Sequence, residues 1–196
     1  MLFRSAAYRY GSADQAAAPA RIAFPSADRA SDTASLFALL VRSGVGGAFV
    51  KSGVPYENGG KTAIEIGHMT MDPAGPECPC GGTGCLEAYI SEDSLVSAVA
   101  SAMQNTDFRE LDHLLAAGDR QALDALVPAM ERASVALLNV RHLLDPGEFF
   151  IISRSHALSG FMASEAQRYL EGHPGPDGSR SEEHTSDIQS RQVISY

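Results

Sequence analysis

The sequence lacks clusters of basic residues, long apolar runs, and cysteines outside one short segment. It holds 15 lysines and arginines against 24 aspartates and glutamates in 196 residues, a net charge of −9. Nucleic-acid surfaces need clustered basic side chains, so this stretch of chain is not expected to contact DNA or RNA. No run approaches the roughly 20 apolar residues of a membrane span, and no signal peptide opens the chain. These absences predict a cytoplasmic protein without a membrane partner.

The two ends of the sequence differ from the rest. Residues 180–190 resemble the translation of a DNA sequencing adapter, and residues 2–5 resemble its complementary end. We therefore interpret residues 1–5 and 180–196 as artefacts flanking a truncated gene, with a disordered tail as the alternative for 180–196. The domain itself is expected within residues 6–179.

The pattern of apolar residues predicts an α/β or α+β domain. Buried strands are expected over 36–41 and 148–153, with a hairpin partner over 46–56. Helical spacing predicts helices over 91–104, 108–118, 119–144 and 156–172. Residues 6–10 are expected to end a truncated helix, residues 11–35 to form a loop, and residues 59–60 a turn.

The expected helix over 119–144 carries two specific predictions. Pro128 lies inside it and is expected to kink or split it. Its buried stripe is expected to include Leu126, Met130 and Leu143.

All the cysteines lie between residues 67 and 87, and a histidine precedes them. Three cysteines cannot all pair with one another, whereas thiolates and imidazole are the ligands that zinc prefers. Nearby glycines supply the backbone freedom that a loop around an ion requires. The segment therefore predicts a closed, structural zinc site, with an ordinary loop as the alternative. The predicted ligands are His68, Cys78, Cys80 and Cys85.

The same segment resembles the signature of the ROK family, named for repressors, open reading frames and kinases. It reads E-x-G-H from Glu65 to His68, and C-x-C-G-x-x-G-C-x-E from Cys78 to Glu87. Residues 39–60 are similar to the family's glycine-rich phosphate hairpin, and residues 136–153 to its late helix, turn and strand. The resemblance implies an α/β, ribonuclease-H-like (actin/hexokinase-like) fold. Of its two lobes, this fragment holds mainly the C-terminal one, with the zinc-binding loop.

The resemblance also implies roles for individual residues. Glu65, His68 and Glu87 match the family's sugar-binding residues, and the predicted zinc ligands match its zinc ligands. The phosphate hairpin maps onto Ser43, Gly44, Gly46 and Gly47. No catalytic residue is expected, because the family's N-D-x-N segment, which supplies the general base, and its D-x-G-x-T motif are both absent from this sequence.

Two positions depart from the family pattern. Arg42 and Arg154 stand where the family has glycines beside the nucleotide, although guanidinium groups could also bind phosphate. Because the sugar half of the signature is intact and the nucleotide half is altered, the pattern favours a sugar sensor over a kinase.

Three functions follow as hypotheses. The leading one is the sugar-binding effector domain of a transcriptional regulator. It would be a homo-oligomer when intact and would reach DNA only through a missing N-terminal domain. The alternative is a fragment of a hexose or amino-sugar kinase, using ATP and magnesium and inactive as it stands. The third is a zinc-stabilised module that binds a protein partner.

Overall fold

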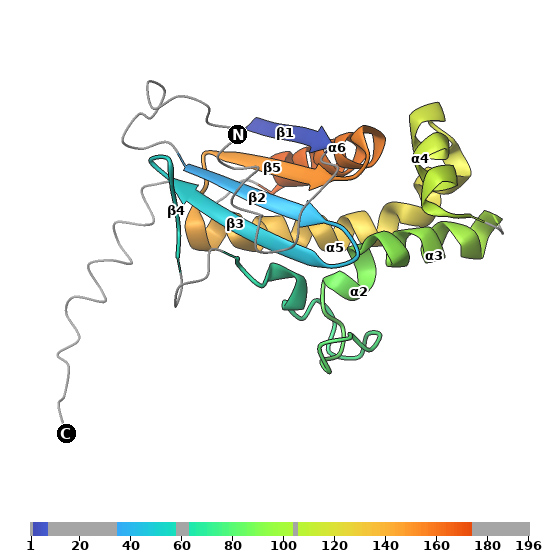
Figure 1. Ribbon diagram of the computed structural model, residues 1–196, viewed down its shortest axis with the longest axis horizontal. Coiled ribbons are helices and arrows are strands. Elements are labelled where there is room, and N and C mark those ends of the chain that lie inside the picture. The colour runs from blue at the N-terminus through green and yellow to red at the C-terminus, as the bar shows by residue number, and fades with distance from the viewer. Residues whose placement is uncertain (1, 8–34, 58–62, 104–105, 174–196) are drawn as a thin grey trace.

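The computed structural model describes residues 2–7, 35–57, 63–103 and 106–173. One five-stranded sheet carries helices along one face and at one end (Figure 1). The turn expected at 59–60, the tail at 180–196 and the loop expected over 11–35, apart from Ser35 at the start of β2, lie outside the described residues. The described elements are β1 (Leu2–Ala7), β2 (Ser35–Val41), β3 (Val45–Lys51), β4 (Val54–Pro55), η3 (Ile66–His68), α2 (Glu87–Ile90), α3 (Glu92–Met103), α4 (Phe108–Ala117), α5 (Arg120–Leu144), β5 (Glu148–Ser153) and α6 (His156–Gly172).

The strands lie in the order β1-β5-β2-β3-β4, which confirms a mixed α/β domain. β2 and β3 form the expected antiparallel hairpin, with Val41 opposite Val45 at its closed end. β5 lies parallel to β2, with Phe149 opposite Phe37. A parallel neighbour requires a long crossover, and the chain makes it through α2 to α5. The short elements η3, α2 and β4 were not expected from the sequence.

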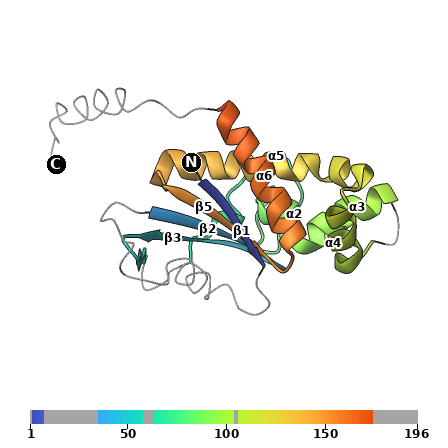
Figure 2. The same ribbon diagram turned by 90° about the horizontal axis from the view of Figure 1, so that it is seen from above.

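β2 is buried on both faces, which explains its continuous apolar sequence. Phe37, Leu39 and Val41 belong to the main core with the inner sides of α5 and α6. Ala38 and Leu40 belong to a smaller cluster on the opposite face, together with Ile152 of β5. In Figure 2, α6 crosses over β1 and β5 while α5 runs beside the sheet.

The long helix excludes a split at Pro128 and corrects one residue of the predicted buried stripe. α5 is continuous from Arg120 to Leu144, so Pro128 does not split it. Leu126 and Met130 are buried as expected, but Leu143 is 76% exposed. Near the end of the helix, Val140 and Leu144 face the core, which leaves Leu143 largely exposed.

The start of the chain corrects a third prediction. Residues 6–10 were expected to end a helix, but Ala6 and Ala7 belong to strand β1 and pair with Ile152 and Ser153 of β5. Pairing with β1 satisfies backbone groups along the outer edge of β5, which an unpaired edge strand leaves open.

The fold brings several turns to one end of the sheet. β2 and β5 are parallel neighbours, so the residues that directly follow them lie at the same end of the sheet. These residues are Arg42 and Arg154. Helix α3 begins at the same end of the sheet. The N–H of its first residue, Glu92, donates to the Arg42 carbonyl oxygen at 2.9 Å. Among the described helices, none combines the length and apolar character required to cross a membrane.

Candidate metal centre and sugar site

The predicted zinc ligands lie in or beside a loop over residues 70–85, here called the cysteine loop. Two isolated bridges hold it, between Thr70 and Cys85 and between Glu77 and Thr83. Inside it, the Cys78 N–H donates to the Gly82 carbonyl at 2.8 Å. The loop projects from the body of the molecule below α2 in Figure 1. Its shape therefore depends on backbone turns, and a bound ion would reinforce them.

Two glycines give the cysteine loop its turns. Gly81 has φ of 89° and Gly84 has φ of 67°, in the left-handed region that other residues resist. A Cβ on Gly84 would also lie 1.6 Å from the Asp72 carbonyl oxygen. The expectation that the loop needs glycine is confirmed at these positions.

The structure brings the four predicted ligand residues together. Their ligand atoms all lie within 4.8 Å of one another. The sulfurs of Cys80 and Cys85 are 3.7 Å apart, and Nδ1 of His68 lies 3.8 Å from Cys78 Sγ. Zn–S bonds of about 2.3 Å at tetrahedral angles place two sulfurs about 3.8 Å apart. Three sulfurs and one imidazole at these separations fit a tetrahedral zinc ion.

Two thiols of the cluster have shifted acidities. The Gly82 N–H, 3.4 Å from Cys80 Sγ, lowers the pKa of that thiol, because the hydrogen bond favours the thiolate. Burial raises the pKa of the Cys85 thiol to about 12, and its hydrogen bond with Cys80 adds to the shift. The metal-free cluster therefore holds a proton on Cys85 at neutral pH, which a metal ion must displace.

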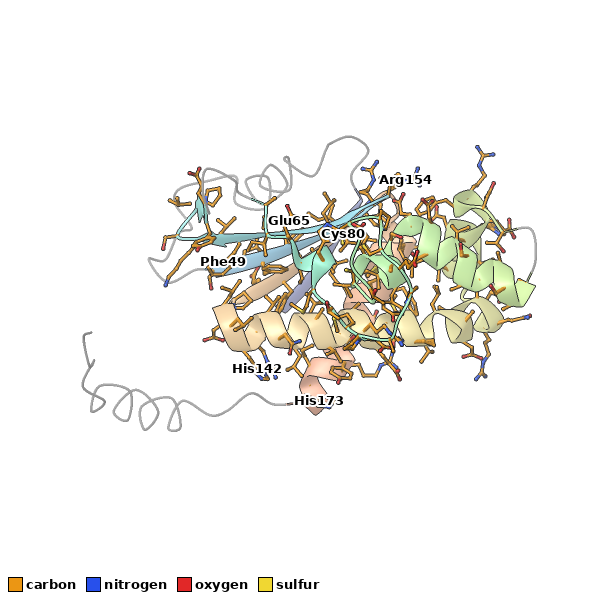
Figure 3. The ribbon with its side chains drawn as sticks, turned by 90° about the horizontal axis from the view of Figure 1, so that it is seen from below. Phe49, Glu65, Cys80, His142, Arg154 and His173 are labelled. Atoms are coloured by element: carbon orange, nitrogen blue, oxygen red, sulfur yellow. The ribbon has the colours of Figure 1, made fainter. Side chains whose placement is uncertain are left out.

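His68 connects the cluster to the first predicted sugar residue. Its Nδ1 faces Cys78, while its Nε2 lies 4.0 Å from Oε2 of Glu65. His68 is the last residue of the short helix η3, and this position fixes the direction of its ring. The side chain of Glu65 is 66% exposed. In Figure 3, Glu65 and Cys80 project from neighbouring segments of the chain. An imidazole held by a metal on one nitrogen would present the other to solvent beside a carboxylate.

Glu87 lies on the other side of the cluster, at the start of α2. Its Oε2 accepts a hydrogen bond of 2.9 Å from the Val45 N–H, and its Oε1 lies 3.9 Å from Cys78 Sγ. Glu87 thus reaches from the cysteine loop to the β2–β3 turn. Glu65, His68 and Glu87 are arranged around one cluster, although no direct contact joins Glu87 to His68 among the described contacts.

The residues matched to the phosphate hairpin occupy two environments. Ser43 and Gly44 form the exposed β2–β3 turn, while Gly46 and Gly47 lie within β3. A Cβ on Gly47 would come within 2.6 Å of the Phe37 ring, so this glycine serves packing in the core. In the turn itself, a Cβ on Gly44 would lie 3.2 Å from Oε2 of Glu87, so the absence of a side chain there leaves room for that carboxylate.

Sequence reasoning gave no role to Glu92. Its carboxylate is buried between Arg42 and Arg154, the two arginines that depart from the family pattern. These residues are 50 and 62 positions from Glu92 in sequence. No local pattern signals such a contact.

A cavity beside Glu65 is mostly apolar. It has a volume of about 440 Å³ and is lined by Phe37, Ile64, Met69, Leu144 and neighbouring residues. Glu65 is the one acidic residue in this lining. Sugar hydroxyls need polar partners on several sides. The cavity therefore does not replace the exposed group of Glu65, His68 and Glu87 as the candidate sugar site.

The chain is similar to known proteins along most of its length. Residues 15–175 match the ROK family. It is 32% identical to the kanosamine kinase of Amycolatopsis mediterranei over 125 residues, which cover 63% of this chain and 41% of that protein. It is 36% identical to an N-acetylmannosamine kinase of Escherichia coli over 91 residues, 46% of this chain and 31% of the relative. The chain thus spans less than half the length of these relatives.

Solved structures share the fold. A ROK hexokinase from Thermus thermophilus superimposes with a TM-score of 0.58 at 30% identity, over 72% of this chain and 50% of that one. A ROK family transcriptional regulator, described as a homologue of the E. coli Mlc protein, gives a TM-score of 0.64 at 21% identity, over 74% of this chain and 39% of that one. Kinases and a regulator therefore share this architecture.

Proposed function

Because the chain belongs to the ROK family, we propose that it binds a sugar at Glu65, His68 and Glu87, beside a structural zinc ion. The observation that carries the proposal is the placement of His68. One ring nitrogen lies 3.8 Å from Cys78 Sγ, and the other lies 4.0 Å from the exposed Glu65 carboxylate. A zinc ion there would fix the ring, so that its outer nitrogen and the carboxylate meet the ligand together.

The chemistry suits a polyhydroxy ligand. Carboxylates accept hydrogen bonds from neighbouring hydroxyl groups, and such charge-assisted bonds are among the stronger ones in proteins. Glu65 offers an exposed carboxylate on one side of His68, and Glu87 a partly buried one beside Cys78. The proposed ligand class is a hexose or an amino sugar, in line with the names of the two relatives.

Four protein ligands close the proposed metal site. His68, Cys78, Cys80 and Cys85 fill a tetrahedral coordination sphere, which leaves no position for a substrate on the ion. The role of zinc would therefore be structural: it would hold the cysteine loop and orient His68.

We assign the whole protein to the sugar-responsive regulators. The two nucleotide-side glycines are replaced by Arg42 and Arg154, while the sugar-side signature is intact. Sugar binding would shift the protein between two conformations, and DNA affinity would change through a domain outside this sequence. The intact protein is proposed to be a homo-oligomer.

An amino-sugar or hexose kinase is the second candidate. It is favoured by the names of both relatives, at 32% and 36% identity. Such a kinase would require ATP, magnesium and a general base. The segments of the family that supply the base and the first phosphate motif are absent from this sequence, so the present chain is expected to be inactive under either assignment.

The metal is tested first, on the complete chain. Elemental analysis is expected to find about one zinc per chain, and none in the double variant Cys80→Ser, Cys85→Ser. A folded protein without zinc would contradict the metal centre. Calorimetry with glucose, N-acetylmannosamine and kanosamine then tests the sugar site.

Binding of one of these sugars is expected to be lost in Glu65→Gln while zinc is retained. Glu57→Gln, a change at another exposed carboxylate, is the matched control and should bind normally. Sugar binding that survives Glu65→Gln would contradict the proposed site. If the zinc-loaded chain binds no sugar at all, the third hypothesis, a zinc-stabilised module for a protein partner, gains support.

A further inference from the structure

The end of the sheet where β2 and β5 finish, at which Glu87 also contacts the β2–β3 turn, has the features of a phosphate site. Arg42 directly follows β2, and Arg154 directly follows the parallel strand β5. Helix α6 begins two residues after Arg154. Ligands of α/β proteins commonly bind beyond the carboxyl ends of parallel strands, and helix N-termini favour anions there. Figure 3 shows Arg154 where β5 ends.

A carboxylate from the chain itself already lies in this position. Glu92, the first residue of α3, is 4% exposed. Arg154 binds it with two groups: Nε donates to Oε1 at 2.9 Å, and Nη2 lies 2.5 Å from Oε2. Nε of Arg42 lies 3.6 Å from Oε1. Glu92 thus receives the bidentate contact that a guanidinium group gives to a phosphate.

Arg154 is also fixed on its other side. Its guanidinium carbon lies 4.2 Å from the centre of the Phe108 ring, in a cation–π contact. Phe108 begins α4, so the arginine is held between α3 and α4. Swinging outward to an external ligand would break the bidentate contact and the ring contact together.

Arg42 retains unused capacity. Its Nε and Nη1 atoms are buried and have no hydrogen-bond partner in the part of the chain that the structure describes. Two guanidinium groups share one carboxylate, so the cluster carries one excess positive charge. The negative charge of Glu92 opposes the entry of a polyphosphate, since two anions a few ångströms apart in a buried site repel strongly. Without that charge, the free donors of Arg42 would be open to an anion.

We infer that Glu92 occupies the phosphate position between Arg42 and Arg154, so that this chain excludes nucleoside triphosphates from the end of its sheet. Glu92 is then the residue that determines whether a phosphate ligand can bind at this end of the sheet. The inference does not rest on sugar binding, because none of the three residues belongs to the sugar site. The two arginines therefore do not bind an external phosphate in place of the missing glycines. The anion that they bind is the carboxylate of Glu92.

The test measures inorganic pyrophosphate and Mg–ATP by calorimetry on the zinc-loaded complete chain. The wild-type chain is expected to show no saturable binding up to millimolar concentration. Glu92→Gln keeps the shape of the side chain and an acceptor for Arg154 but removes the charge. It is expected to bind pyrophosphate at least tenfold more tightly than the wild type.

Glu165→Gln is the matched control. It neutralises the carboxylate of the more exposed Glu165–Arg168 pair on α6 and should leave pyrophosphate binding as in the wild type. Sub-millimolar binding of Mg–ATP by the wild type would overturn the inference, and this measurement needs no variant. So would a folded Glu92→Gln protein with no gain over Glu165→Gln. Sugar binding is titrated separately, so its failure leaves this result intact.

Discussion

The carboxylate of Glu87 accepts a hydrogen bond of 2.9 Å from the backbone N–H of Val45. This bond joins the first residue of α2, which follows the cysteine loop, to the first residue of β3. Val45 is buried, so few other partners are available to its N–H. The cysteine loop and the β2–β3 turn are therefore mechanically connected through one side chain.

Replacing that side chain should cost stability. Glu87→Ala leaves the buried Val45 N–H unpaired, and we expect the free energy of unfolding to fall by about 1–3 kcal/mol. Urea denaturation of the zinc-loaded protein measures it. Glu131→Ala, at an exposed position on α5, should change stability by less than about 0.5 kcal/mol. Equal effects of the two changes would show that the Val45 bond contributes nothing.

Gly84→Ala is expected to disrupt the cysteine loop. The added Cβ would lie 1.6 Å from the Asp72 carbonyl oxygen, at a φ of 67° that alanine resists. Zinc content should fall well below that of the wild type. Gly172→Ala, where an added Cβ meets nothing within 4 Å, should keep full zinc content. Normal zinc binding by Gly84→Ala would mean that the loop adopts another shape.

Zinc affinity should depend on pH through the cysteine thiols. Burial raises the pKa of Cys85 to about 12, so binding must release its proton, and affinity should fall as pH is lowered. Competition with a chelator of known pH dependence, at pH 6.5 and 7.5, measures this change. Affinity that rises toward pH 6.5 would exclude thiolate ligands.

The same shift predicts how the metal-free protein responds to alkali. A thiol whose pKa is raised in the folded state stabilises the fold below its unfolded value of 9.0, and this contribution is lost as pH rises toward about 12. Stability of the metal-free protein should therefore decline over this interval. Denaturation of Cys85→Ser, which lacks the group, should show a smaller decline.

Pro128→Ala should stabilise the protein. Pro128 is exposed inside the continuous helix α5 and has no N–H to donate within it. Alanine restores that donor, and we expect a gain of about 1–3 kcal/mol in the free energy of unfolding. Thermal unfolding of the zinc-loaded protein measures the gain. A loss would indicate that the ring of Pro128 makes contacts worth more than the hydrogen bond.

Much of the fold follows from local patterns. The apolar run over 36–41, the glycine turn after it and the spaced apolar residues of 119–144 predict a hairpin and a long helix, and both are present. The errors arise where packing against distant segments decides the outcome. Residues 6 and 7 form strand because they pair with β5 at the edge of the sheet. Leu143 is exposed because Val140 and Leu144 take the core-facing positions at the end of α5.

For the site, the sequence by itself indicated which residues could hold a metal, because metal ligands are few in kind and here lie in or beside one loop. Cys78, Cys80 and Cys85 need only short backbone turns to meet, and glycine supplies them. His68 and Glu65 lie three residues apart and so face each other locally.

Only the tertiary structure decided the contacts of Glu92 and Glu87. Glu92 meets Arg42 and Arg154 because two parallel strands end, and helix α3 begins, at one end of the sheet, which no spacing along the chain encodes. Glu87 meets Val45 across 42 residues for the same reason. Contacts between distant segments depend on how the elements pack, whereas a metal-binding loop depends on its own residues.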